Sequence, residues 1–166
     1  MNNGIFLLLG SNRGRSLEIL QRASEKIESD VGAILVRSAV YKTAAWGFAD
    51  QPDFYNQVLR IESETAPEAL LAELLDIEAS LGRQREQKWG PRIIDIDLLF
   101  YGQQILNTPR LTLPHPGIPN RRFVLVPLTE IAADWQHPVL KKTMTDLLEA
   151  CDDTLAVEKI TPDTES

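Results

Sequence analysis

Residues 89–101 read Trp-Gly-Pro-Arg-Ile-Ile-Asp-Ile-Asp-Leu-Leu-Phe-Tyr, and this stretch indicates a buried strand with a charged site on it. Asp95 and Asp97 are separated by one residue within an otherwise apolar run. Because side chains alternate faces along a strand, the two carboxylates share a face and originate about 6–7 Å apart. We expect that face to continue into Leu99 and Tyr101. The opposite face is expected to carry Ile94, Ile96 and Leu98.

Two neighbouring carboxylates in apolar surroundings predict a metal site. They repel each other and lose hydration unless cations lie between them. Such a pair is suited to hard divalent metals that also bind a phosphate chain. Pro91 fixes its own backbone and biases Gly90 towards an extended conformation, which brings Arg92 near the carboxylates. A guanidinium in this position favours a polyphosphate ligand. The alternative is a half-exposed strand whose polar face happens to carry Asp.

The order of elements predicts an α+β fold. Period-two and helical spacing alternate as β-α-β-β-α-β, which is the ferredoxin-like arrangement of an antiparallel sheet with both helices on one face. Ser16 is a candidate cap for the first helix, and Thr65 with Glu68 forms a capping box for the second, which Gly82 ends. The strands are expected at 4–10, 34–43, 54–63 and 93–101, and the first helix at 16–30.

The remaining chain is expected to be less regular. Residues 103–122 are rich in Pro and turn residues and predict loop with short strands. A short helix is expected after Pro127, and another over 143–150. We expect a single domain over 1–152 and a frayed acidic tail over 153–166.

Composition restricts the partners. The 166 residues contain one cysteine, Cys151, so no disulfide framework exists, which fits a reducing, cytoplasmic location. The apolar run at residues 5–9 is too short for a signal peptide or a membrane span. The net charge of −7 argues against nucleic acid as a partner. However, the window from Arg83 to Arg122 contains seven basic and three acidic residues, which predicts a local anion site.

Several segments together resemble the 6-hydroxymethyl-7,8-dihydropterin pyrophosphokinase family of folate biosynthesis. The segment from Trp89 to Leu99 is similar to the family's signature, and the other blocks follow in the family's order between about residues 5 and 138. These blocks are Gly10-Ser11-Asn12, Asp50-Gln51-Pro52-Asp53-Phe54-Tyr55-Asn56, Gly82-Arg83-Gln84-Arg85, Arg110-Leu111-Thr112-Leu113-Pro114-His115 and Asn120-Arg121-Arg122-Phe123.

The resemblance implies an enzyme that transfers pyrophosphate from ATP to the hydroxymethyl group of a reduced pterin and releases AMP. It implies that Asp95 and Asp97 hold two Mg²⁺ ions that bridge the phosphates. Arg83 and Arg92 match arginines that grip the phosphates during catalysis. The residues expected to bind ATP are Arg83, Arg85, Arg92, Leu98, Arg110, Thr112, His115 and Arg121. The expected state is a monomer without nucleic-acid or membrane partners.

The pterin site is expected on the strand at 54–63. Phe54 and Asn56 are two residues apart, so their side chains share one face of the strand. The ring of Phe54 can stack on a pterin, and the amide of Asn56 can hydrogen-bond to the polar edge of the pterin. The resemblance places Phe123 opposite as a second ring. It also implies pterin contacts from Thr43, Ala44, Trp46, Trp89 and Asp95.

Two other classes of protein stay open at this stage. Palm-type nucleotidyl transferases and cyclases also carry two carboxylates on a ferredoxin-like sheet. A non-enzymatic ferredoxin-like module for ligand or RNA binding is the other alternative, although Asp95 and Asp97 would repel RNA without metal. The sequence contains no P-loop motif, and its Gly10–Gly14 segment lacks the spacing of a dinucleotide fingerprint.

Overall fold

Eight strands, four α-helices and one 3₁₀ turn form the described part of the computed structural model, which is residues 2–44, 53–82 and 93–160. In chain order they are β1 (Asn2–Ser11), α1 (Ser16–Asp30), β2 (Ala33–Arg37), β3 (Val40–Thr43), β4 (Phe54–Ser63), α2 (Pro67–Ser80), β5 (Asp95–Tyr101), β6 (Leu106–Asn107), β7 (Thr112–Leu113), η1 (Ile118–Asn120), α3 (Arg122–Ala132), α4 (Met144–Ala150) and β8 (Val157–Ile160).

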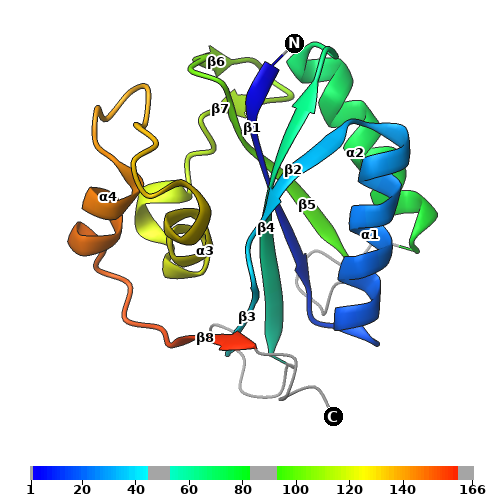
Figure 1. Cartoon of the computed structure of the whole chain (residues 1–166), viewed down its shortest axis with the longest axis horizontal. Coiled ribbons are helices and arrows are strands. Elements are labelled where there is room, and N and C mark those ends of the chain that lie inside the picture. Colours follow the sequence, from blue (N-terminus) through cyan, green and yellow to red (C-terminus); the bar gives the residue numbers. More distant parts are fainter. Residues whose placement is uncertain (1, 45–52, 83–92, 161–166) are drawn as a thin grey trace.

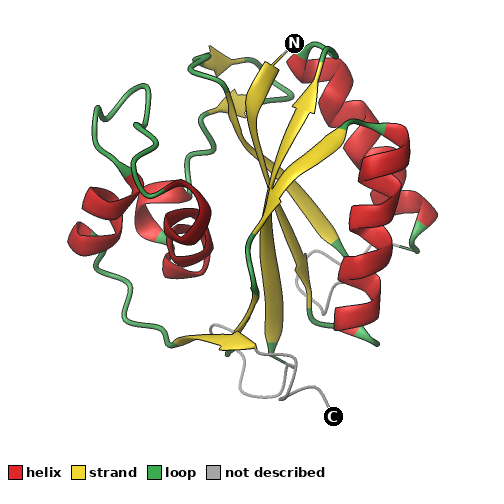
Figure 2. Cartoon of the chain, in the orientation of Figure 1, coloured by secondary structure: helices red, strands yellow, loops and turns green. Residues whose placement is uncertain are grey.

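The molecule has three layers, with a sheet between two pairs of helices (Figures 1 and 2). The strands of the main sheet are hydrogen-bonded in the order β5-β1-β4-β3-β8, and β2 also pairs with β4. Every pairing within the described residues is antiparallel. Figure 1 shows α1 and α2 on one side of the sheet and α3 and α4 on the other. The α+β class predicted from the sequence is therefore confirmed.

Alternation along β1 builds a separate core on each face of this sheet. Ile5, Leu7 and Leu9 are fully buried and pack in the cluster formed with α1 and α2. Phe6 and Leu8 belong to the second cluster, which α3 and α4 cover. Burying one such side chain contributes about 1.5–3 kcal/mol, so both faces of β1 stabilise the fold.

A β-bulge in β5 changes the face of the residues after the acidic pair. Leu7 pairs with Leu98 and Phe6 with Phe100, so Leu99 is the extra residue on β5. As a result, Leu99 and Phe100 both pack on the side of α3 and α4, whereas Tyr101 packs on the opposite side. The prediction that Leu99 shares the face of the two carboxylates is confirmed, but the prediction for Tyr101 is wrong because the bulge reverses the alternation.

The predicted helix starts differ from the observed ones. The N-cap of α1 is Arg15 and that of α2 is Ala66, and neither helix has a side-chain cap hydrogen bond. Pro67 occupies the first turn of α2, where its fixed φ suits a helix. The helix expected after Pro127 instead spans Arg122–Ala132 with that proline inside it. Burial of its apolar face against the sheet outweighs the missing hydrogen bond of the proline.

Two strand predictions also need correction. The strand expected at 34–43 is interrupted at Ser38, which separates β2 from β3 and whose hydroxyl accepts a hydrogen bond from the Val58 N–H at 2.9 Å. The tail expected to fray from 153 contains β8, which pairs with β3. A strand as short as β8 has no strong sequence signal, because it is held by backbone hydrogen bonds to the edge of β3.

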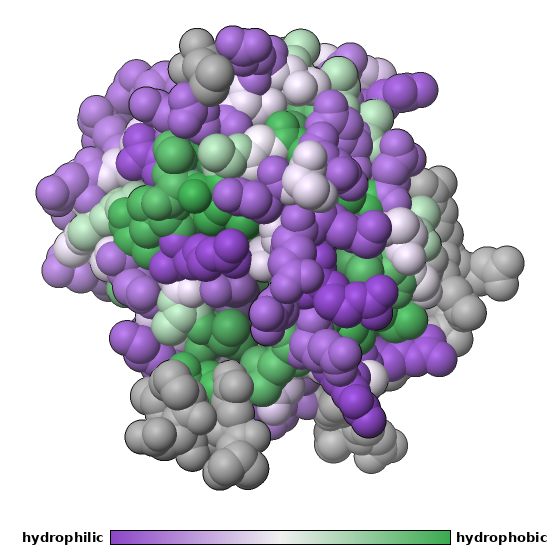
Figure 3. Space-filling model, turned by 45° about the vertical axis from the view of Figure 1, so that its right-hand side comes forward, coloured by the Kyte–Doolittle hydropathy of each residue, from purple (hydrophilic) through white to green (hydrophobic). Residues whose placement is uncertain are grey.

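One face of the molecule is mostly polar. Figure 3 shows hydrophilic side chains over most of one face, with apolar groups in smaller areas between them. Among the described helices, none has both the length and the hydropathy needed to cross a bilayer.

Candidate active site

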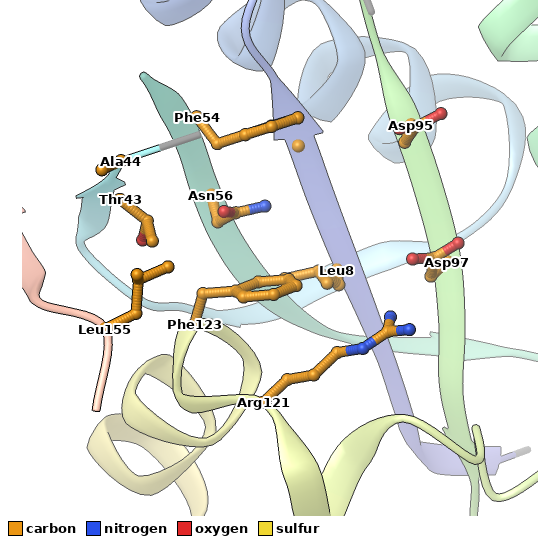
Figure 4. Close-up of a pocket in the computed structure, with 11 residues that line it drawn as sticks. Leu8, Thr43, Ala44, Phe54, Asn56, Asp95, Asp97, Arg121, Phe123 and Leu155 are labelled. Atoms are coloured by element: carbon orange, nitrogen blue, oxygen red, sulfur yellow. The ribbon is translucent and has the colours of Figure 1, made fainter. Parts of the chain in front are cut away.

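A cavity of about 260 Å³ lies on the face of the sheet that α3 and α4 cover (Figure 4). Its lining side chains come from segments that are distant from one another in sequence. These segments are β1, β3, β4, β5, the start of α3 and the segment before β8. The lining residues are Leu8, Gly10, Thr43, Ala44, Phe54, Asn56, Asp95, Asp97, Arg121, Phe123 and Leu155.

Asp95 and Asp97 form one wall of this cavity. Their positions in β5 put both side chains on the same face, opposite Gly10 and Leu8 of β1 respectively. Gly10 leaves the space that the neighbouring side chains need, because a Cβ there would lie 2.6 Å from Asn56 Nδ2. Figure 4 shows the two carboxylates one above the other along β5. The spacing in the sequence therefore predicted their common face correctly.

The backbone between the two carboxylates is anchored by a residue that the sequence did not reveal. The buried Glu78 of α2 accepts a hydrogen bond from the Ile96 N–H, with a donor–acceptor distance of 2.6 Å. The only signal was an acidic residue four positions after Leu74, within the apolar stripe of that helix. This contact holds the part of β5 from which both aspartates project.

Two aromatic rings face each other across the cavity. Figure 4 shows Phe54 on one side and Phe123 on the other, with the Asn56 amide between them. Asn56 donates from Nδ2 to the Leu9 carbonyl at 3.3 Å. Its Oδ1 is buried and, like Thr43 Oγ1, has no hydrogen-bond partner among the described residues. Buried polar atoms are rarely left unpaired, so these two oxygens are suited to a ligand that brings its own hydrogen-bonding groups.

A second cavity of about 770 Å³ adjoins the first and shares Arg121, Phe123 and Leu155 with it. His115 lines this second cavity, together with Pro116, Gly117, Asn120, Asp152 and Asp153. In Figure 4 the Arg121 guanidinium points towards Asp97. Arg121 thus lies where a ligand extending from one cavity to the other would pass.

The protonation of His115 follows from its contacts. Its Nδ1 accepts a hydrogen bond from the Gly117 N–H at 3.0 Å, so neutral His115 carries its proton on Nε2. Burial lowers the pKa of His115, Asp97 opposes this change and Arg121 adds to it. At neutral pH the side chain is therefore an uncharged Nε2–H donor, which can bind a phosphate oxygen.

The donor set restricts the metal that the site could hold. No group of three or more His, Cys, Asp or Glu side chains with metal-binding geometry occurs in the described ranges. Two carboxylates fit Mg²⁺, which usually keeps several waters and takes further ligands from substrate phosphates. They do not fit a metal that requires a complete cage of protein ligands.

Comparison with known proteins identifies the family. The model of the 7,8-dihydro-6-hydroxymethylpterin-pyrophosphokinase family matches residues 6–133. The chain belongs to this family. A curated 2-amino-4-hydroxy-6-hydroxymethyldihydropteridine pyrophosphokinase of Synechocystis sp. is 43% identical over 161 residues, which is 96% of this chain and 82% of that protein. The protein of the same name from Methylorubrum extorquens is 47% identical over 130 residues, or 78% of this chain and 82% of that one.

Solved structures agree with the fold of the pyrophosphokinase family. The crystal structure of wild-type Plasmodium falciparum HPPK-DHPS with STZ-DHP matches this chain with a TM-score of 0.73 and 17% sequence identity. The match covers 90% of this pyrophosphokinase-family chain but 43% of that longer chain. At this level of identity the likeness concerns the fold alone.

The structure brings together most of the described site residues that the family resemblance implied. Thr43, Ala44, Phe54, Asn56, Asp95, Asp97, Arg121 and Phe123 all line the first cavity. Leu98 instead has its side chain in the core on the opposite face of the sheet. Arg110 and Thr112 are exposed and line neither of the two cavities. Trp46, Arg83, Arg85, Trp89 and Arg92 lie outside the described residues. Leu8 and Leu155 line the cavity without having been predicted.

Proposed function

We propose that the cavity between Phe54 and Phe123 binds the reduced pterin of a pyrophosphokinase reaction. The chain transfers pyrophosphate from ATP to the hydroxymethyl group of 6-hydroxymethyl-7,8-dihydropterin and releases AMP, a step of folate biosynthesis. The observation that supports the site best is the pair of unsatisfied oxygens, Asn56 Oδ1 and Thr43 Oγ1, in the same cavity as the two carboxylates.

The shape and chemistry of the cavity suit a pterin. The ring is flat and stacks between Phe54 and Phe123, each contact contributing about 0.5–1.5 kcal/mol beyond buried area. Asn56 Oδ1 accepts a hydrogen bond from the polar edge of the ring. With that edge at Asn56, the hydroxymethyl group is directed towards Asp95 and Asp97. Trp46, Ala44 and Trp89 complete the proposed pterin site.

Asp95 and Asp97 would hold Mg²⁺ in this proposal, with two ions expected. When bound, the metal neutralises charge on the phosphate oxygens. His115 donates from Nε2 and Arg121 from its guanidinium to those oxygens, and Arg83, Arg85 and Arg92 grip the chain. The nucleoside contacts the backbone at Leu98 and the side chains of Arg110 and Thr112.

The transfer itself depends on positioning of the two substrates more than on covalent catalysis by the protein. The hydroxyl oxygen of the pterin attacks the β-phosphorus and loses its proton, the bond from that phosphorus to the oxygen bridging the α-phosphate breaks, and AMP leaves. The aromatic walls hold the pterin in line and exclude water from the attacking group. Donors from Arg121 and His115 stabilise the charge that develops on the phosphate oxygens.

The core is, in our proposal, a variant of the ferredoxin-like arrangement. The strand order β5-β1-β4 followed by β2 and β3 supports it, since β2 and β3 both pair with β4 and together take the place of one strand. The additions are α3, α4 and β8.

The reaction is tested by identifying the nucleotide product. Incubation with ATP, Mg²⁺ and the reduced pterin, followed by chromatography, should give AMP and the pterin diphosphate in equal amounts. ADP would indicate a simple kinase, and a cyclic nucleotide or a nucleotide–pterin adduct with free pyrophosphate would indicate the rival cyclase or nucleotidyl transferase. Omission of the pterin controls for ATP hydrolysis.

A further inference from the structure

The segment that follows α4 returns to the cavity. Residues 152–160, which we call the C-terminal strap, run from α4 to the edge of the sheet, where β8 pairs antiparallel with β3 (Figure 1). Val157 pairs with Thr43, one of the residues that line the cavity. The family match ends at residue 133, so the strap lies beyond the part of the chain that identifies the family.

The strap caps α3. The N-cap residue of this helix, Arg121, makes no side-chain cap hydrogen bond. Instead, Asp153 Oδ2 accepts a hydrogen bond from the Arg122 N–H at 3.0 Å. A carboxylate at a helix N-terminus both satisfies a free N–H group and interacts favourably with the helix dipole. Asp153 thus supplies, from 31 residues away in sequence, the cap that the helix itself lacks.

One further hydrogen bond lies within the strap, and another ties the strap to the same turn. The second oxygen of Asp153 accepts from the Leu155 N–H at 2.9 Å. The Leu155 carbonyl in turn accepts from Arg122 Nε at 3.2 Å. Arg122 lies between Arg121, the N-cap residue, and Phe123, and both of these residues line the cavity. Any shift of the first turn of α3 would therefore move both the guanidinium and the ring.

The strap also lines the site directly. Leu155 is half-buried and belongs to the lining of both cavities. Figure 4 shows its side chain beside Thr43 and close to Phe123, at the end of the cavity away from the two aspartates. It is therefore placed to contact the part of a ligand that is farthest from the metal-binding carboxylates.

We infer that the C-terminal strap is part of the pterin site: Leu155 contacts the pterin as an apolar wall, and Asp153 is a positioning residue that holds Arg121 and Phe123 through the cap of α3. This inference rests on the proposed function, because it assigns the first cavity to the pterin. It adds a specificity-determining segment outside the matched region of the family.

The wall is tested by Leu155→Ala in the full-length chain, with Leu148→Ala as the matched control. Leu148 is also half-buried near the C-terminus, but it lines neither cavity. Leu155→Ala should raise the pterin KM and the pterin Kd about tenfold, with kcat and the nucleotide Kd changed less than about twofold. Leu148→Ala should lower the melting temperature without raising the pterin KM. An unchanged pterin KM in Leu155→Ala, or an equal rise in both variants, would overturn the assignment.

The positioning role is tested by Asp153→Ala, with Asp146→Ala as its control. Asp146 belongs to the capping box of α4 and lines neither cavity, so both variants lose one cap. Each should melt about 2–4 °C lower, but only Asp153→Ala should raise the pterin KM. Asp153→Asn keeps an acceptor for the Arg122 N–H and should restore most of the binding. Equal KM values for Asp153→Ala and Asp146→Ala would show that the cap is merely structural.

Failure of the inference can be told from failure of the proposed function. If the wild-type chain produces no AMP, the proposed reaction is wrong whatever the variants do. If the wild type produces AMP and binds pterin by calorimetry, but Leu155→Ala and Asp153→Ala bind it equally well, the strap has no part in the site. Should Asp153→Ala fail to fold, Asp153→Asn and Leu155→Ala still decide the question.

Discussion

Asn56, which we propose binds the pterin, carries a local cost to the stability of the fold. Its amide nitrogen has a partner in the Leu9 carbonyl, whereas its amide oxygen is buried without one among the described residues. An unsatisfied buried acceptor costs about 1–3 kcal/mol, and a ligand donor would remove that cost. Proteins commonly accept such local cost at functional sites.

Asn56→Ala should therefore separate stability from binding. We expect the free energy of unfolding to change by less than about 1 kcal/mol, because a weak hydrogen bond is lost together with an unsatisfied acceptor. Pterin affinity should fall by about 10- to 100-fold. Urea denaturation and calorimetry measure the two effects. A large loss of stability with little loss of affinity would make Asn56 a structural residue.

Asp97 provides a second test at the level of one side chain. Asp97→Asn keeps the shape of the residue but removes the charge of a proposed metal ligand, so the rate of AMP formation should fall at least about 100-fold. Asp97 is partly exposed, and its loss of charge should change the melting temperature without metal by less than about 2 °C. A much larger drop in that temperature would show that the carboxylate stabilises the fold instead.

Among the secondary-structure elements, β5 depends on α2 for its alignment. Glu78 is nearly fully buried, and its carboxylate accepts the Ile96 N–H from between the two aspartates. Glu78→Ala should lower the free energy of unfolding by about 1–3 kcal/mol and reduce kcat, because that N–H loses its acceptor and β5 loses an anchor. Glu78→Gln should retain most of both. Equal losses in the two variants would mean that the charge of Glu78 matters more than its hydrogen bond.

The first turn of α3 contributes one of the two rings of the cavity. Phe123→Ala should weaken pterin binding by about 1–3 kcal/mol, since stacking and buried area are both lost, while ATP binding changes little. Ile131→Ala on the same helix is the control, because Ile131 packs on the second core cluster and lines neither cavity. Calorimetry that finds the same loss for pterin and for ATP would assign Phe123 to the core.

For the whole molecule, acid stability should depend on His137. Burial lowers its pKa, its Nδ1 accepts hydrogen bonds from the Val139 and Leu140 N–H groups, and its ring packs edge-on against Phe100. The unfolded chain therefore binds a proton at higher pH than the folded one does. It follows that folding stability falls as the pH decreases through the ordinary histidine pKa, about 6.5.

His137→Asn removes this titration but keeps an acceptor in its side chain. Melting temperatures at pH 7.5 and pH 5.5 should fall more on acidification for the wild type than for the variant. Other groups titrate equally in both proteins, so they cancel in the difference. The same drop in both proteins would show that His137 is protonated in the folded state at pH 5.5.

Local sequence patterns were sufficient to predict much of the fold and of the candidate site. Alternation predicted that Asp95 and Asp97 share a face, the spacing of apolar residues predicted the two helices on one side of the sheet, and the ordered motifs identified the family. These features depend on residues within a few positions of each other, or on motifs read one after another along the chain. These features can be predicted from the sequence without knowledge of any long-range contact.

The remaining features of the fold and of the site were decided only by the tertiary structure, because these features depend on contacts between distant segments. The bulge at Leu99 arises from pairing with β1, and the first turn of α3 is capped by Asp153 across 31 residues. Likewise, Leu155 reaches the cavity only because β8 pairs with the edge of β3. The sequence of a polar tail does not predict such a backbone pairing.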